Sequence, residues 1–338
     1  MTTSRERLIQ TLEFDNPDRI PRDLWTLPWA QTHHPGTIES IRKDFPMDMA
    51  GAPAFLKEPL ISKGDPYVEG ISIDEWGCER VSIHAGVIGE VKHPLVNDWQ
   101  QDLEKVHIPV EALTITPEKI NAFCAATDLF VTGGCCANPF ERIQYIRGSQ
   151  NLYIDLAEQP EEFFILLDRI HQFFCQQLEL WCQTDVDAIN LMDDWGAQNQ
   201  LLISPRMWRK LFKPLYQEYC DIAHSYSKYV FMHSDGHISA IYPDLIEIGV
   251  NALNSQLFIM DIEALGETYG GKITFWGEID RQHLLVKASV EEIHAAVNRV
   301  YNACSRHGGV IAQCEMGPGA KPENVYAVYE AWNAVNRS

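Results

Sequence analysis

Two short segments carry the residue types of a metal site. They are residues 231–236 (FMHSDG) and 312–315 (AQCE), and each follows or includes a short apolar run that reads as a buried strand. If both runs are strands of one barrel, the polar residues at their ends meet at the same rim. An imidazole and a thiolate are common zinc ligands, and protein-bound zinc activates a heteroatom of a substrate. The sequence therefore predicts a zinc site built around His233 and Cys314.

Acids and amides follow the other predicted strands of this half of the chain. Asp193 and Asp194 follow residues 188–192, Gln256 follows residues 252–255, and Glu278 follows residues 273–276. In a barrel the active site lies where strands lead into helices. So many polar strand ends in succession are hard to explain by packing, and we interpret them as one active site.

Spacing suggests individual roles within this group. His233 and Asp235 are two positions apart, so in a strand their side chains point to the same side. They can then bind one ion together, or act as a ligand and the group that orients it. Glu278 offers a hard oxygen donor that can complete a tetrahedron. We predict His233, Cys314, Glu278 and Asp235 as metal ligands, and Asp194, Asp235 and Glu278 as catalytic residues.

Aromatic side chains are frequent near the same predicted loops. Several tryptophans at loop positions can build a flat apolar pocket for an aromatic or macrocyclic ligand. Asp193 and Asp194 are candidates for a general base, a substrate anchor or a group that orients another residue, and we assign Asp193 to substrate binding. The substrate-binding residues that we predict are Trp25, Trp76, Tyr145, Asp193, Trp195 and Gln256.

The elements that must position these residues alternate between strand and helix. Apolar runs predict strands at residues 20–25, 47–55, 129–134, 188–192, 229–232, 252–255, 273–276 and 310–313, with helices between most of them. Nearly pure apolar strands are typical of a parallel sheet covered on both sides. Eight such units predict an α/β fold of the (β/α)8 TIM barrel type, formed as a single domain over residues 1–338. An open doubly wound sheet is the alternative, but no glycine-rich loop follows the first strand.

One segment departs from this alternation. Residues 67–93 carry glycines and alternating apolar residues, which predicts antiparallel hairpins inserted into the barrel.

Composition limits the partners of the chain. Its 338 residues are 46% hydrophobic, and 47 acidic against 27 basic residues give a formal charge of −20. Such a surface repels nucleic acid and anionic membranes. The nine cysteines are scattered, no apolar run has the length to span a membrane, and the chain does not open on the pattern of a secretory signal. These features predict free thiols in a reducing cytoplasm. Whether the chain assembles with copies of itself is left open by the sequence.

At these motifs the chain resembles the uroporphyrinogen decarboxylase superfamily. The anchors are residues 74–77 (DEWG), 203–205 (ISP), 233–236 (HSDG), 246–250 (IEIGV), 276–277 (WG) and 322–325 (PENV). The resemblance spans most of the chain and implies the barrel fold. The superfamily contains true decarboxylases and zinc-dependent methyltransferases that work with corrinoid proteins, so the resemblance is less specific for the reaction.

The resemblance favours the methyltransferase branch. Decarboxylases bind substrate carboxylates with an arginine-rich N-terminal motif, and the matching stretch at residues 24–34 has no arginine. The methyltransferases bind zinc with a His-x-Cys motif and a distant Cys. His233 and Cys314 match the first and last of these ligands, whereas Asp235 stands at the middle cysteine. The third ligand is therefore Asp235, Glu278 or Gln256.

Fewer thiolates make zinc more electrophilic, which suits an ether oxygen better than a thiolate nucleophile. By resemblance we predict a zinc methyltransferase that demethylates a small methoxylated, aromatic substrate. The methyl group would pass to the cobalt of a corrinoid on a separate protein, because the chain has no Asp-x-His-x-x-Gly cobalamin motif. The alternatives are a corrinoid-to-thiol methyltransferase of the coenzyme M type, a uroporphyrinogen decarboxylase, and a non-catalytic corrinoid- or tetrapyrrole-binding protein.

Overall fold

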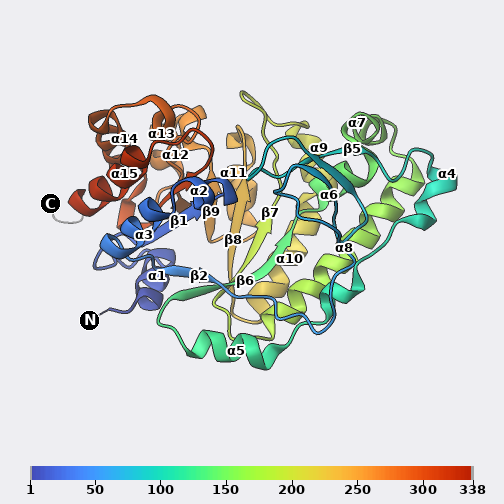
Figure 1. Ribbon diagram of the computed structural model, residues 1–338, viewed down its shortest axis with the longest axis horizontal. Helices are drawn as coiled ribbons and strands as arrows, with labels where there is room; N and C mark the ends of the chain where they lie inside the picture. The colour runs from blue at the N-terminus through green and yellow to red at the C-terminus, as the bar shows by residue number, and fades with distance from the viewer. Residues whose placement is uncertain (1, 336–338) are drawn as a thin grey trace.

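A computed structural model describes residues 2–335 and contains the predicted barrel (Figure 1). Eight parallel strands form one sheet in the order β1-β11-β10-β9-β8-β7-β6-β2, so the last strand of the chain returns to pair with the first. The strands are β1 (Arg22–Thr26), β2 (Met49–Gly51), β6 (Phe130–Ala137), β7 (Ala188–Met192), β8 (Tyr229–Ser234), β9 (Ala252–Ser255), β10 (Thr274–Trp276) and β11 (Val310–Met316). The nearly closed sheet, alternating with helices, confirms the (β/α)8 fold.

A buried carboxylate closes the seam between β1 and β2. The backbone N–H of Asp48 donates to the carbonyl of Arg22 at 2.9 Å. The Asp48 carboxylate is completely buried and accepts hydrogen bonds from the backbone N–H of Arg22 and from the side chains of Ser4, Arg7 and Arg19. These bonds join the first two strands at the point where the sheet has no backbone ladder.

The first helix fills the amino-terminal end of the barrel. α1 (Ser4–Leu12) begins with a capping box between Thr3 and Glu6, which satisfies the free N–H groups of its first turn. Leu8 and Leu12 of α1 belong to the same buried cluster as the inward-facing strand residues Phe130, Phe231 and Trp276. The polar site is therefore confined to the opposite, carboxyl-terminal end of the strands.

Helices surround the sheet. They include α3 (Pro35–Asp44), α5 (Pro117–Ala125), α6 (Pro139–Arg147), α7 (Ser149–Glu158), α8 (Glu161–Cys182), α9 (Pro205–Leu211), α10 (Lys213–Ser225), α11 (Tyr242–Glu247), α12 (Ile262–Tyr269), α14 (Val290–Cys304) and α15 (Pro322–Val335). Short helices are α2 (Pro28–His33), α4 (Trp99–Asp102) and α13 (Leu284–Lys287). Single 3-10 turns are η1 (Leu103–Lys105), η2 (Val110–Leu113), η3 (Ser239–Ile241), η4 (Leu257–Ile259) and η5 (Arg306–Gly308).

The predicted insertion forms a separate three-stranded antiparallel sheet. It consists of β3 (Gly70–Ile73), β4 (Glu79–Ser82) and β5 (Glu90–His93), with β4 in the middle. The turn between β3 and β4 holds this sheet against the helices on the right-hand side of Figure 1. Asp74 accepts a hydrogen bond from Arg142 of α6 at 2.8 Å, and Trp76 packs edge-on against Phe173 of α8.

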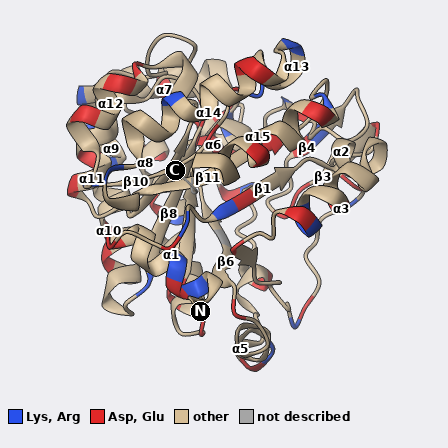
Figure 2. Cartoon of the chain, turned by 90° about the vertical axis from the view of Figure 1, so that its left-hand side faces the viewer, with Lys and Arg blue, Asp and Glu red and all other residues tan. Residues whose placement is uncertain are grey.

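In the view of Figure 2, acidic and basic residues both occur on the outer helices, for example on α1 and α3. Among the described residues, no helix is both long enough and apolar enough to span a membrane.

Candidate metal centre

The ends of β7 and β8 bring an imidazole and two carboxylates together. His233 Nε2 lies 3.6 Å from Asp194 Oδ1 and 3.6 Å from Asp235 Oδ1. One donor atom from each of the three side chains lies within 4.8 Å of the others. His233 is the next-to-last residue of β8, whereas Asp194 follows β7, its neighbour in the sheet. We call these three residues the central cluster.

Asn254 fixes the proton on the histidine. The Asn254 Nδ2 group donates to the backbone carbonyl of Trp276, so the amide oxygen Oδ1 is turned toward His233. His233 Nδ1 lies 2.7 Å from that oxygen. Because an amide oxygen only accepts, Nδ1 carries a proton, and in a neutral ring Nε2 then has the lone pair. Nε2 faces two carboxylates, an arrangement that favours a positive charge there, either a second proton on the ring or a metal ion.

The carboxylates are held in place from outside the cluster. Asp194 Oδ1 accepts from the backbone N–H of Asp235 at 2.8 Å. Asp235 Oδ2 accepts from Arg281, whose guanidinium also donates to Glu278 at 3.1 Å and lies 3.6 Å from Glu315. Asp235 Oδ1, the oxygen that faces His233, is buried and has no hydrogen-bond partner. Arg281 thus fixes one oxygen of Asp235, while the other oxygen remains available to bind a metal ion.

Burial and mutual repulsion raise the proton affinity of these acids. Burial, and then the charge of Asp235, raises the pKa of Asp194. Burial raises the pKa of Glu278 to about 8, against the lowering effect of Arg281. Carboxylates gathered in this way favour a positive charge among them.

The donor set fits a zinc ion. Zinc with tetrahedral nitrogen and oxygen ligands at ordinary bond lengths separates its ligand atoms by roughly 3.3–3.6 Å. The two distances of 3.6 Å from His233 Nε2 match this separation. A ligand histidine normally donates its other ring N–H to an oxygen, as His233 does to Asn254. The three residues leave a fourth position for water or substrate.

A cavity of about 410 Å³ opens beside His233 inside the barrel. Trp25 and Trp276 form part of its wall, and the Trp25 ring centre lies 5.3 Å from that of His233. Asp23 accepts the indole N–H of both tryptophans, at 2.9 and 3.0 Å. Arg42 is the single lysine or arginine side chain among the residues that line the cavity. Its walls are thus largely apolar and aromatic, which suits a small ligand with little charge.

The structure does not bring Cys314 to His233. The Cys314 thiol is completely buried on the outer side of β11, where it contacts the Tyr329 hydroxyl of α15 at 3.7 Å. Side chains alternate along a strand, so its neighbours Gln313 and Glu315 take the opposite side. Burial raises the pKa of the Cys314 thiol to about 12. The prediction that His233 and Cys314 lie together is therefore corrected. The side chains that face His233 are those of Asp194 and Asp235.

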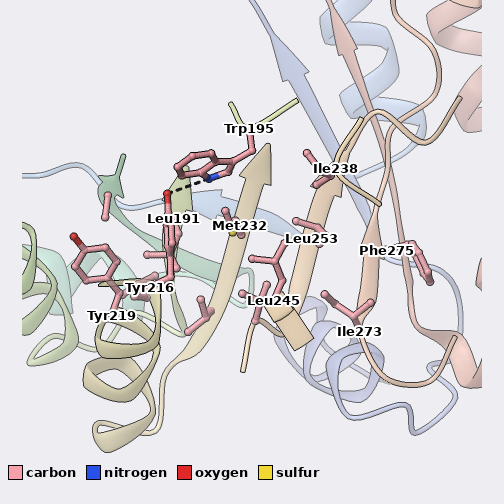
Figure 3. Packing of buried hydrophobic residues seen from close by; sticks show 14 of the residues in the cluster. Leu191, Trp195, Tyr216, Tyr219, Met232, Ile238, Leu245, Leu253, Ile273 and Phe275 are labelled. Carbon is pink, nitrogen blue, oxygen red and sulfur yellow. Dashed lines mark hydrogen bonds between the residues drawn. The ribbon is translucent and has the colours of Figure 1, made fainter. Parts of the chain in front are cut away.

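Two residues predicted to touch substrate lie in the protein core. The completely buried carboxylate of Asp193 accepts the backbone N–H groups of Phe140 and Glu141 at 2.9 and 2.8 Å, and also the hydroxyl of Tyr216. It thereby caps the first turn of α6. Trp195 is buried between helices, and its indole N–H donates to Tyr216 at 3.3 Å (Figure 3). Neither position fits contact with a substrate, because both side chains are directed at the surrounding helices α6, α9 and α10.

Four other predicted residues are not members of the cluster. Trp76 is buried below the inserted sheet, and Tyr145 donates to Glu141 at 2.7 Å. Gln256 accepts the backbone N–H of Gly236 at 3.0 Å, so it shapes the turn after β8. Glu278, predicted as a ligand, instead holds Arg281. Trp25 does line the cavity.

Sequence reasoning missed three residues that shape this site. Asn254 and Arg281 orient members of the cluster, and Glu141 has a buried oxygen without a hydrogen-bond partner. The sequence contained a signal for two of them, since Asn254 interrupts an apolar strand and Glu141 follows the end of β6. Nothing local pointed to Arg281, which reaches Asp235 across 46 positions of the chain.

Comparisons with known proteins agree with this fold. A structure described as a methyltransferase from Methanosarcina mazei superposes with a TM-score of 0.69 at 18% sequence identity, covering 99% of both chains. A glycosylated endo-beta-1,4-xylanase from Gloeophyllum trabeum has a TM-score of 0.46 and 12% identity, with 98% of both chains covered, which supports no argument about this chain. No curated protein matches the sequence. The family described as uroporphyrinogen decarboxylase (URO-D) matches residues 72–335, and the chain therefore belongs to that family.

Proposed function

We propose that this protein is a zinc-dependent methyltransferase that removes the methyl group of a small methoxylated aromatic compound. The methyl acceptor is the cobalt of a corrinoid carried by a separate protein. The observation that carries the proposal is that His233 Nε2 faces Asp194 and Asp235 beside an aromatic cavity. The similarity in fold to a protein described as a methyltransferase supports the same class of reaction.

Each residue of the site has a defined task in this proposal. Asp194, His233 and Asp235 would hold the ion, while Asn254 accepts the hydrogen bond of Nδ1 and so orients the ring. Bound zinc supplies Lewis acidity that draws electron density from an ether oxygen. Arg281 holds Asp235 in position and balances part of the negative charge of the surrounding acids.

The cavity would bind the body of the substrate. Trp25 and Trp276 would provide aromatic surface for one ring, with the methoxy group beside His233 at the edge of the central cluster. The reaction would break the carbon–oxygen bond of the ether, and the corrinoid of the partner protein, as the second substrate, would supply the electron pair for the new bond to the methyl carbon. The oxygen would leave with the electron pair of the broken bond and take up a proton from water.

Decarboxylation of uroporphyrinogen fits the cavity poorly. A tetrapyrrole with many carboxylates requires several cationic side chains, and Arg42 alone supplies one here. Transfer to a thiol such as coenzyme M is the closer alternative. Zinc that activates thiols usually has sulfur ligands, and the central cluster contains none.

The test combines a methyl-transfer assay with a metal assay. Purified protein is given methoxyarenes, zinc and a reduced corrinoid protein, and methylcobalt is followed by its absorbance. We expect methyl transfer that is lost in His233→Ala, with His237→Ala as the control because His237 lies outside the cluster. Transfer to a thiol without reaction of any ether would favour the alternative, and release of carbon dioxide from uroporphyrinogen would overturn the proposal.

A further inference from the structure

A second group of metal-binding residue types lies outside the barrel, between α8 and α10. His171 and Cys175 are one turn apart on α8, and Glu218 faces them from α10. Donor atoms of these three side chains lie within 4.8 Å of one another, as in the central cluster. None of them contributes to the cavity beside His233. We call this group the outer cluster.

The distances in the outer cluster suit a small ion. Cys175 Sγ lies 3.7 Å from His171 Nε2, close to the roughly 3.5 Å that separates sulfur and nitrogen ligands of tetrahedral zinc. Glu218 Oε2 lies 2.9 Å from the same nitrogen, so the carboxylate needs to move outward by a few tenths of an ångström. Glu218 can do so because its side chain is 56% exposed.

Tyr219 allows the histidine to change its protonation pattern. Without metal, His171 Nε2–H donates to Glu218 and Nδ1 accepts from the Tyr219 hydroxyl, which lies 3.0 Å away. If Nε2 binds an ion, the proton moves to Nδ1, and the hydroxyl oxygen accepts it. A hydroxyl serves in both roles, so His171 keeps its hydrogen bond in both states. This is the outer-shell support that ligand histidines usually have.

We propose that His171, Cys175 and Glu218 form a second metal site that takes a borderline ion such as Zn²⁺ or Co²⁺. Nitrogen, sulfur and oxygen donors together select such ions over Mg²⁺ and Ca²⁺. The ion would tie α8 to α10 on the outside of the barrel, with a fourth position open to water at the exposed Glu218. This site is independent of the function proposed above.

Cobalt spectroscopy tests the outer cluster separately from the central one. The full chain is freed of metal with a chelator and titrated with Co²⁺, whose bond to a thiolate gives an intense near-ultraviolet absorption band. The central cluster has only nitrogen and oxygen donors and contributes no such band. We expect the band in the wild type and in His233→Ala, and its loss in Cys175→Ser. Cys182→Ser, a buried thiol on the same helix, is the matched control and should keep the band.

Glu218→Gln gives a second test that does not disturb the core. Because Glu218 is largely exposed, the variant should fold normally and bind Co²⁺ at this site roughly tenfold more weakly or worse. No thiolate band in the wild type, a band that survives Cys175→Ser, or a band that depends on Cys314 would overturn the proposal. The last result would instead support the ligand set predicted from the sequence.

Discussion

Asn254 is the residue that orients His233, the histidine that we propose as a metal ligand. Its amide is oriented by the Trp276 carbonyl, and its oxygen takes the Nδ1 proton of the histidine. In the neutral ring, the lone pair at Nε2 is a consequence of this orientation. Metal affinity should therefore depend on a side chain that never touches the ion.

Asn254→Leu tests this dependence. The variant keeps a similar volume but removes the acceptor, so the ring can turn or place its proton on Nε2. We expect zinc affinity at the central cluster to fall about 10- to 100-fold. The measurement is competition with a chromophoric chelator. Asn190→Leu on the neighbouring strand β7 is the control, and an equal loss in both variants would contradict the role of Asn254.

At the scale of elements, two adjacent acids after β7 have different tasks. Asp193 caps α6 from inside the core, whereas Asp194 faces His233. The direction of each side chain is set by the turn that follows the strand. One position along the chain thus separates a structural carboxylate from a proposed metal ligand.

The matched substitutions Asp193→Ala and Asp194→Ala should separate these tasks. Asp193→Ala leaves three buried donors without an acceptor, at about 1 kcal/mol or more each, so the free energy of unfolding should fall by about 3 kcal/mol or more. Asp194→Ala should cost about 1 kcal/mol but weaken zinc binding. Urea denaturation with a chelator present measures the stability of each variant. Equal destabilisation by the two variants would contradict this assignment.

Most strands and helices could be predicted because each has a clear apolar pattern, although the strand predicted at residues 47–55 is reduced to Met49–Gly51. The direction of the Cys314 side chain could not be predicted. Residues 310–312 are apolar on both faces of β11, so their pattern does not reveal which alternate side chains enter the barrel. A polar residue at the end of a strand correctly indicates at which end of the barrel the site lies. The direction of its side chain, however, depends on the tertiary structure. The same limit applies to Asp193 and Trp195.

At the scale of the whole molecule, the barrel is closed by side chains at one seam. β1 and β2 carry no ladder between them, and Asp48 connects them through Arg22, Arg7 and Arg19. The cavity is lined by residues of both strands, so the seam also supports one of its walls. Stability of the closed barrel should depend strongly on this one carboxylate.

Asp48→Ala should lower the free energy of unfolding by about 3–5 kcal/mol, because it removes a completely buried carboxylate that pairs with Arg7 and Arg19 and accepts the backbone N–H of Arg22. Urea denaturation measures the effect. Asp44→Ala, which removes an exposed bond from Tyr326, should cost about 1 kcal/mol or less and serves as the control. A loss below about 1 kcal/mol in Asp48→Ala would show that the seam is held by other contacts.

The central claim is that Asp194, His233 and Asp235 hold the metal of this barrel. Anomalous X-ray diffraction at the zinc absorption edge, from crystals of the full chain grown with zinc, tests it most directly. We predict an anomalous peak bonded to His233 Nε2, Asp194 and Asp235, next to the cavity lined by Trp25. An absent peak at that position, or a zinc ion bound by Cys314, would contradict the account.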